Sequence, residues 1–97
     1  MIRHVALLHW KENTAADAIQ AVSDAFSILA TLTPELKKYQ YGPDLAFYSS
    51  NVDYVLVAEF DNEHDFKSYV VNPDHTDLMK RVSVPTKASF SSPQFEL

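Results

Sequence analysis

Runs of aliphatic, aromatic and β-branched residues, bounded by polar or turn-forming residues, predict four strands along the chain. The predicted strands are Ile2–Trp10, Leu36–Tyr41, Tyr54–Phe60 and the tail Ala88–Leu97. Pro93 lies within the tail and cannot donate a ladder hydrogen bond, so the fourth strand is predicted to be an edge strand or to contain a bulge.

A first helix is predicted between the first two strands. Thr14-Ala-Ala-Asp17 resembles a capping box, in which the threonine oxygen accepts an orphan N–H and the acidic side chain reaches back. Apolar residues then recur at helical spacing, and the stripe consists of Ile19, Val22, Phe26 and Leu29. The helix is predicted to end near Leu32-Thr33, because Pro34 disfavours the α conformation in the residue before it.

Gly42-Pro43 is predicted to close the second strand, and Asp44–Asp53 is predicted to be a loop. Gly42 is the only glycine in the chain. A positive φ or a close backbone approach would therefore cost least at this position.

A second helix is predicted to begin in the acidic stretch Asp61–Asp65, because negative charge is favourable at a helix N-terminus. Pro73 lacks an N–H and disfavours the α conformation at Asn72, so the helix is predicted to break there and to restart as a second segment reaching Pro85. His75 then lies about one and a half turns beyond Tyr69. The phenol and the imidazole can converge on one side of the break.

The predicted order is β-α-β-β-α-β, which is typical of an α+β, ferredoxin-like fold with an antiparallel sheet and both helices on one face. The first and third strands are apolar on both faces, yet helices cover only one. Four residues would be left bare on the other face: Val5, Leu7, Val55 and Val57. A second copy of the sheet is the simplest cover, so the sequence predicts a homodimer whose sheets face each other as an α+β barrel.

Composition narrows the classes of function. The 97 residues, 46% hydrophobic, predict a single domain over residues 1–97 with one core. The net charge of −5 argues against nucleic acid or an anionic membrane as a partner. The first ten residues have too short an apolar run for a signal peptide or a membrane span, and the chain has no cysteine for disulfides, so a cytoplasmic protein is expected.

His75 and Tyr69 are the candidates for chemistry. Histidine titrates near neutral pH and suits general-base catalysis, and a tyrosine hydroxyl can donate a hydrogen bond to an oxyanion. Each residue also has a structural interpretation. His75 could cap the second helical segment, Tyr69 could be a core aromatic with a satisfied hydroxyl, and His4 could be a satisfied core histidine.

Other kinds of site lack the residues they need. The four histidines show no recurrent ligand spacing and no HExxH, so no metal is expected. The chain has no cysteine nucleophile, no serine in a Gly-x-Ser-x-Gly turn and, with one glycine, no phosphate-binding loop. No cofactor is therefore expected.

Several motifs, in the same order along the chain, resemble the stress-responsive A/B-barrel (Dabb) family. They are Ile2–Lys11, Tyr41-Gly-Pro-Asp44, Tyr54–Phe60, Tyr69-x-x-Asn-Pro-x-His75 and the final Gln-Phe-Glu-Leu. The resemblance implies a dimeric α+β barrel, often with an undefined, stress-linked role. One plant branch of the family is a cofactor-free polyketide cyclase, olivetolic acid cyclase, which catalyses an intramolecular aldol condensation.

The resemblance to this cyclase implies His75 as general base and Tyr69 as the group that orients the substrate carbonyl, with His4 lining the same cavity. The residues expected to contact a ligand are His4, Ala6, Leu8, Phe26, Tyr54 and Leu56. Two positions depart from the family pattern: Asn72 replaces a histidine found in many members, and Tyr54 replaces a histidine of the cyclase.

Two functions remain open at this point. The first is a cofactor-free enzyme for an aldol cyclisation or isomerisation. The second is a dimeric stress protein, or a module that binds a small apolar or keto-acid ligand, in which the same residues serve packing and capping. An open pocket of a few hundred cubic ångströms with His75 and Tyr69 pointing inward would favour ligand binding or chemistry.

Overall fold

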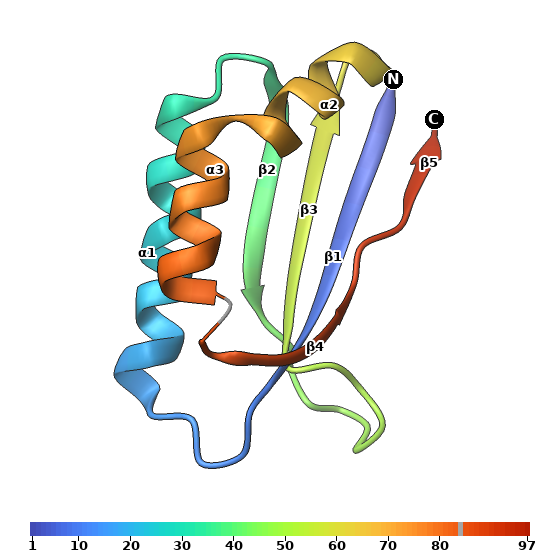
Figure 1. Ribbon diagram of the computed structural model, residues 1–97. Coiled ribbons are helices and arrows are strands. Elements are labelled where there is room, and N and C mark those ends of the chain that lie inside the picture. The colour runs from blue at the N-terminus through green and yellow to red at the C-terminus, as the bar shows by residue number, and fades with distance from the viewer. Residues whose placement is uncertain (84) are drawn as a thin grey trace.

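The protein folds as one antiparallel sheet covered on one face by helices (Figure 1). The structure, a computed structural model, describes residues 1–83 and 85–97. The strands are β1 (Ile2–Trp10), β2 (Leu36–Pro43), β3 (Tyr54–Phe60), β4 (Lys87–Ser91) and β5 (Gln94–Glu96). The helical elements are α1 (Ala16–Leu32), α2 (Glu63–Val71), α3 (Pro73–Leu78) and the π-helical turn η1 (Met79–Ser83). The predicted ferredoxin-like α+β fold is confirmed.

β1 is the central strand of the sheet. The order is β2-β3-β1-β4, every pair is antiparallel, and β5 continues along the same edge of β1 as β4. The predicted fourth strand is therefore two strands separated at Ser92-Pro93. Pro93 has no N–H, but its carbonyl accepts a hydrogen bond from the backbone N–H of Val5 at 2.9 Å, so the edge is held across the gap.

The two faces of the sheet carry the two sets of residues that the two-residue period of a strand predicts. Even-numbered residues of β1 and β3 face the helices, and Leu8, Leu56 and Phe60 are almost fully buried there. We call the opposite side the outer face. It carries Val5 paired with Val57 and Leu7 paired with Val55, all half-buried in the single chain.

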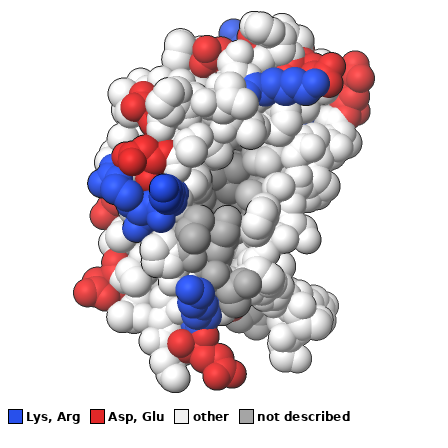
Figure 2. All heavy atoms as spheres, in the orientation of Figure 1, with Lys and Arg blue, Asp and Glu red and all other residues white. Residues whose placement is uncertain are grey.

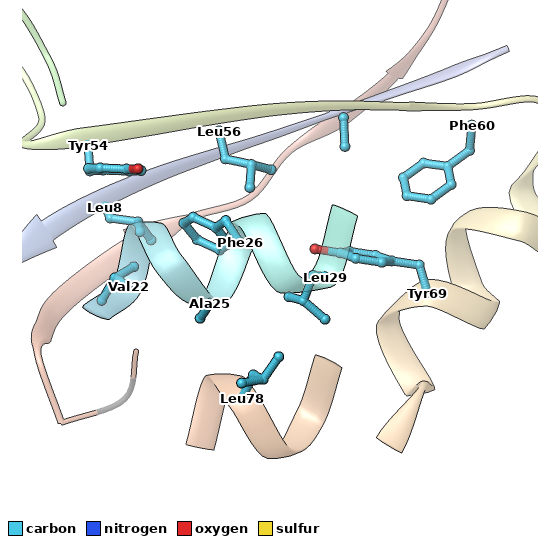
Figure 3. Packing of buried hydrophobic residues seen from close by; sticks show 11 residues of the cluster. Leu8, Val22, Ala25, Phe26, Leu29, Tyr54, Leu56, Phe60, Tyr69 and Leu78 are labelled. Atoms are coloured by element: carbon cyan, nitrogen blue, oxygen red, sulfur yellow. The ribbon is translucent and has the colours of Figure 1, made fainter. Parts of the chain in front are cut away.

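The core lies between the sheet and the helices (Figure 3). Side chains from the strands meet the buried stripe of α1, namely Val22, Ala25, Phe26 and Leu29. Tyr69 enters from α2 and Leu78 from α3. The predicted helical stripe is thus core, except that Ile19 is only partly buried.

One local prediction is wrong, and one strand is longer than predicted. The residue before α1 is Ala15, which has no side-chain cap, and the Thr14 hydroxyl instead donates to the carbonyl of Lys11, so no capping box forms. β2 runs through Gly42 and Pro43, and Gly42 does not have a positive φ. An edge strand accepts a proline at its end because no partner needs its N–H. Among the described residues, positive φ occurs at Asn13 and Ala46.

The break between α2 and α3 forms as predicted. Asn72 leaves the helical conformation with φ −59° and ψ 129°, and Pro73 is the first residue of α3. The Asn72 side-chain oxygen accepts the backbone N–H of Asp74 at 2.8 Å, while the Asn72 N–H donates to the Tyr69 carbonyl. Asn72 therefore ends one helix and caps the next. The helical segment continues through η1 to Ser83, and Val84 lies outside the described residues.

Replacing Asn72 with alanine should remove the cap of α3 and lower the free energy of unfolding by about 1 kcal/mol, a typical value for a lost N-cap. Urea denaturation of the wild type and Asn72→Ala measures the difference. Asn72→Asp is the matched control, because aspartate keeps an oxygen that can accept the Asp74 N–H. A loss as large in Asn72→Asp would mean that the side-chain acceptor is not the stabilising element.

Candidate functional site

A cavity of about 510 Å³ lies between the helix-facing side of the sheet and the helices α2 and α3. Figure 2 shows this side of the molecule hollowed between the helices and the β4–β5 edge, with Lys, Arg, Asp and Glu gathered toward the rim. The walls are mostly apolar. The lining residues are His4, Ala6, Leu8, Phe26, Leu56, Phe66, Lys67, Tyr69, Val70, Val71, His75, Met79, Phe90, Ser92 and Gln94.

The fold brings most of the predicted site residues to this cavity. Both chemical candidates, His75 and Tyr69, line it, as do five of the six residues expected to contact a ligand: His4, Ala6, Leu8, Phe26 and Leu56. Tyr54 lies elsewhere. Its side chain is buried against Trp10 and Phe26, and its hydroxyl is hydrogen-bonded to Ser23. The cavity wall is therefore built without Tyr54.

Tyr69 reaches the cavity from the last turns of α2 and is only 2% exposed. Its hydroxyl is 2.9 Å from the hydroxyl of Tyr39, so the structural interpretation of a satisfied phenol fits the geometry. Burial raises the pKa of Tyr69, and burial together with the neighbouring Tyr69 raises that of Tyr39. Both phenols keep their protons at neutral pH. When Tyr39 donates to Tyr69, the Tyr69 proton can be donated to a ligand oxygen.

His75 lies on the first turn of α3, and its ring centroid is 4.4 Å from that of Tyr69. The break at Asn72 creates this contact because it aims α3 back across the end of α2. Nδ1 of His75 is 3.2 Å from the backbone carbonyl of Val70. A carbonyl only accepts, so Nδ1 carries the proton in the neutral ring and the basic lone pair is on Nε2. The same contact also satisfies a carbonyl at the end of α2, as a capping histidine would.

His4 lies on β1 at the opposite wall of the cavity from α3 and is 9% exposed. Its ring packs on Phe66, with centroids 5.1 Å apart, and lies 6.4 Å from the ring of Tyr69. Burial, and secondarily the nearby His75, lowers the pKa of His4 from 6.5 to about 4. His4 is therefore neutral at physiological pH. Its Nδ1 is 3.0 Å from the side-chain nitrogen of Gln94.

Sequence reasoning missed the cavity residues contributed by α2, η1 and the β4–β5 edge. They are Phe66, Lys67, Val70, Val71, Met79, Phe90, Ser92 and Gln94. Gln94 is the most informative of them, because β5 pairs with β1 so that Gln94 lies directly opposite His4. A polar residue just after Pro93 in the tail was the available signal, but only the strand register connects it to His4.

Two kinds of feature are absent from the part of the chain that the structure describes. No three histidine, aspartate or glutamate side chains there gather closely enough to hold a metal ion. None of the helices in residues 1–83 and 85–97 is both long and apolar enough to cross a membrane.

Comparison with known proteins identifies relatives over nearly the whole chain. The family model described as "Stress responsive A/B Barrel Domain" matches residues 2–89. A dimeric ferredoxin-like protein of unknown function from Thermobifida fusca YX is 36% identical, with a TM-score of 0.90, over 99% of this chain and 90% of that one. No protein with a curated description matches significantly.

More distant solved structures share the fold. A hydroxynitrile lyase from Passiflora edulis is 17% identical, with a TM-score of 0.86, over 99% of this chain and 92% of its own. A Dabb family protein from Mesorhizobium loti is 18% identical, with a TM-score of 0.82, over 99% of this chain and 95% of its own.

Proposed function

The chain belongs to the stress-responsive A/B-barrel domain family, and we propose that it binds a small, largely apolar ligand with a keto or carboxylate oxygen. The observation that carries this proposal is the convergence of His4, Tyr69 and His75 on one apolar cavity. An apolar wall with a few placed polar groups is the usual composition of a small-molecule site. The volume of about 510 Å³ is also within the usual range for such sites.

A second candidate function is proton transfer without a cofactor. In this proposal Nε2 of His75 removes a proton from a carbon next to a carbonyl, and the C–H electron pair moves into the enolate. Tyr69 donates its hydroxyl proton in a hydrogen bond to the enolate oxygen. The enolate carbon then attacks a second carbonyl of the same molecule, whose C=O electron pair moves to its oxygen, and the His75 imidazolium protonates the resulting alkoxide. Alternatively, the imidazolium returns the proton to a different carbon of a conjugated enolate. His75 is neutral again at the end of either course. The first course is an aldol cyclisation of the polyketide-cyclase type, and the second is an isomerisation.

The observation that favours this chemistry is the 4.4 Å contact between the Tyr69 and His75 rings, with a proton assigned to Nδ1 of His75 by Val70. A lyase also occurs on this fold, since the Passiflora edulis relative is a hydroxynitrile lyase. Tyr69 and His75 would supply the donor and the base that such proton transfers need.

The proposal includes a homodimer formed through the outer face of the sheet. Val5, Leu7, Val55 and Val57 form an apolar strip there. The Thermobifida fusca relative is described as dimeric. Sheet-to-sheet packing of two copies would cover the strip and leave the cavity, on the opposite side of the sheet, available in each subunit. A cytoplasmic location and a stress-linked role complete the proposal.

Binding is tested by NMR titration with a panel of aromatic acids and β-keto acids. The wild type should show shifts at the imidazoles of His75 and His4 with at least one of them. Tyr69→Phe, which removes one hydrogen-bond donor, should weaken that binding about tenfold. Tyr48→Phe is the matched control, because Tyr48 is 73% exposed on the β2–β3 loop and should bind as the wild type does.

Catalysis is tested by following the same β-keto acids for cyclised or isomerised products. His75→Gln should abolish turnover, whereas His64→Gln, at an exposed position on α2, should retain it. Imidazole resonances that respond neither to Tyr69→Phe nor to any ligand would contradict the proposal. They would favour the alternative in which these residues only pack and cap.

A further inference from the structure

Gln94 and His4 form a pair across the β1–β5 edge. The strand register sets them directly opposite each other, and both side chains line the cavity. The side-chain nitrogen of Gln94 is 3.0 Å from Nδ1 of His4. The hydrogen bond links β5, the last strand, to β1, the central strand, at the wall of the cavity.

The orientation of the Gln94 amide is fixed by a second contact. Its side-chain nitrogen also donates to the backbone carbonyl of Ser92. That carbonyl can only accept, so the nitrogen, and not the oxygen, of the amide must face it. An NH₂ group has two hydrogens, which here go to Ser92 and to His4.

This arrangement fixes the tautomer of His4. Nδ1 receives a proton from Gln94, so it must present its lone pair, and the hydrogen of the neutral ring is on Nε2. A protonated ring would place an N–H of His4 against the N–H of Gln94. The pair therefore also disfavours the imidazolium, in the same direction as the burial that lowers the pKa of His4.

The Nε2–H of His4 is reached from the cavity. Within the described residues, the contact with Gln94 is the one side-chain hydrogen bond of His4, so Nε2 has no partner there. No fully buried side-chain nitrogen or oxygen among these residues lacks a partner, so Nε2 is not fully buried. His4 lines the cavity, so Nε2 is the atom that it offers to an occupant.

We propose that Gln94 is a positioning residue that holds His4 as a neutral hydrogen-bond donor for a ligand oxygen. This inference rests on the proposed function and restricts the chemical class of the ligand. His4 donates through Nε2, whereas His75, with its proton held on Nδ1 by Val70, has its lone pair on Nε2. Two histidines in opposite tautomers suit a compound with a carbonyl or carboxylate oxygen beside an acidic C–H or O–H, such as a β-keto acid.

The first test is ¹⁵N-resolved NMR of the histidine side chains in the free protein. His4 should show the Nε2–H tautomer in the wild type. Gln94→Leu, which keeps a side chain of similar size but no donor, should give a mixture of tautomers. Gln94→Glu should raise the pKa of His4 by at least about one unit, because a carboxylate accepts from Nδ1–H. Gln20→Leu, at an exposed position on α1, is the matched control and should leave His4 unchanged.

The second test is titration with benzoylacetate, an aromatic β-keto acid. Gln94→Leu should weaken its binding about tenfold, and Gln20→Leu should not. The role of Gln94 would be overturned, even if benzoylacetate binds, by either of two results. His4 could carry its proton on Nδ1 in the wild type, or the tautomer of His4 could be the same in Gln94→Leu as in the wild type. If His4 has the Nε2–H tautomer but benzoylacetate binds the wild type and Gln94→Leu equally well, the role of His4 as a donor to the ligand would be overturned. Absence of binding to every panel member would count against the proposed function itself, whatever the tautomer.

Discussion

Replacing Val57 with aspartate is expected to separate the proposed dimer into monomers. Val57 is paired with Val5 near the middle of the apolar strip on the outer face. Sheet-to-sheet packing would bury its side chain, and a buried, unpaired carboxylate costs several kcal/mol. Each subunit already carries a net charge of −5, which adds repulsion. We expect dimerisation to weaken by more than about 100-fold, or about 2.7 kcal/mol, in sedimentation equilibrium.

The matched control for this experiment is Ile28→Asp. Ile28 is another large aliphatic residue, 47% exposed, but it lies on α1 in the helix layer. The Ile28→Asp protein should remain as dimeric as the wild type. Far-UV circular dichroism separates dissociation from unfolding in both variants. A wild type that is monomeric at micromolar concentration, or a Val57→Asp protein as dimeric as Ile28→Asp, would show that the outer face is not the interface.

Acidification should destabilise the protein through His4. Its pKa is about 4 in the folded protein, compared with 6.5 for the unperturbed side chain. Between these values the unfolded chain binds a proton that the folded chain does not, so the free energy of unfolding falls as the pH falls. At about 1.4 kcal/mol per pH unit, His4 alone should account for a loss of about 3 kcal/mol once the pH is below 4. The full contribution is present above pH 6.5.

His4→Gln isolates this effect from the carboxylates that protonate in the same range. Glutamine cannot titrate, but its side-chain oxygen can accept the hydrogen bond of Gln94. Urea denaturation from pH 7 to pH 4 should therefore show a shallower pH dependence in His4→Gln than in the wild type. His9→Gln is the control, because the His9 side chain is 46% exposed. Equal slopes in the wild type and His4→Gln would contradict a depressed His4 pKa.

The sequence was sufficient to predict the fold because its main signals are local. Successive residues of a strand point to opposite faces, so residue order alone grouped the side chains of β1 and β3 by face, and the apolar stripe of α1 assigned its buried side. Asn72-Pro73 predicted the break because proline restricts the backbone regardless of tertiary context. The apolar outer face was predictable because β1 and β3 are apolar on both faces, whereas the helices cover only one face of the sheet.

The errors have physical causes that a single sequence does not reveal. Thr14 has the residue type of a cap, but its hydroxyl finds an acceptor in the preceding turn, at Lys11. Gly42 permits a positive φ without requiring one, and the strand pairing of β2 keeps it extended.

The π-helical turn η1 has no pattern of its own in the sequence.

The site was predicted in part for the same reason. His75 and Tyr69 are close in sequence, and the break between them implies their contact. Gln94 and His4 are 90 residues apart, and only the register of β5 on β1 joins them. Tyr54, which was expected to contact a ligand, does not line the cavity, and its hydroxyl is hydrogen-bonded to Ser23 on α1, 31 residues away in the chain. Non-local pairings of this kind need coordinates.

The central position of β1 determines where the chain can accept insertions and deletions. Its even-numbered residues line the cavity or the core, and its odd-numbered residues face outward. Because the strand repeats every two residues, inserting or deleting one residue within β1 would reverse the facing of every residue on one side of the change, for example turning Leu8 outward and Leu7 inward. A single indel in β1 would thus disable the cavity and the apolar strip together, whereas the loop at residues 44–53 can absorb extra residues without moving either. Length variation is tolerable at the edges of this fold and prohibited at its centre.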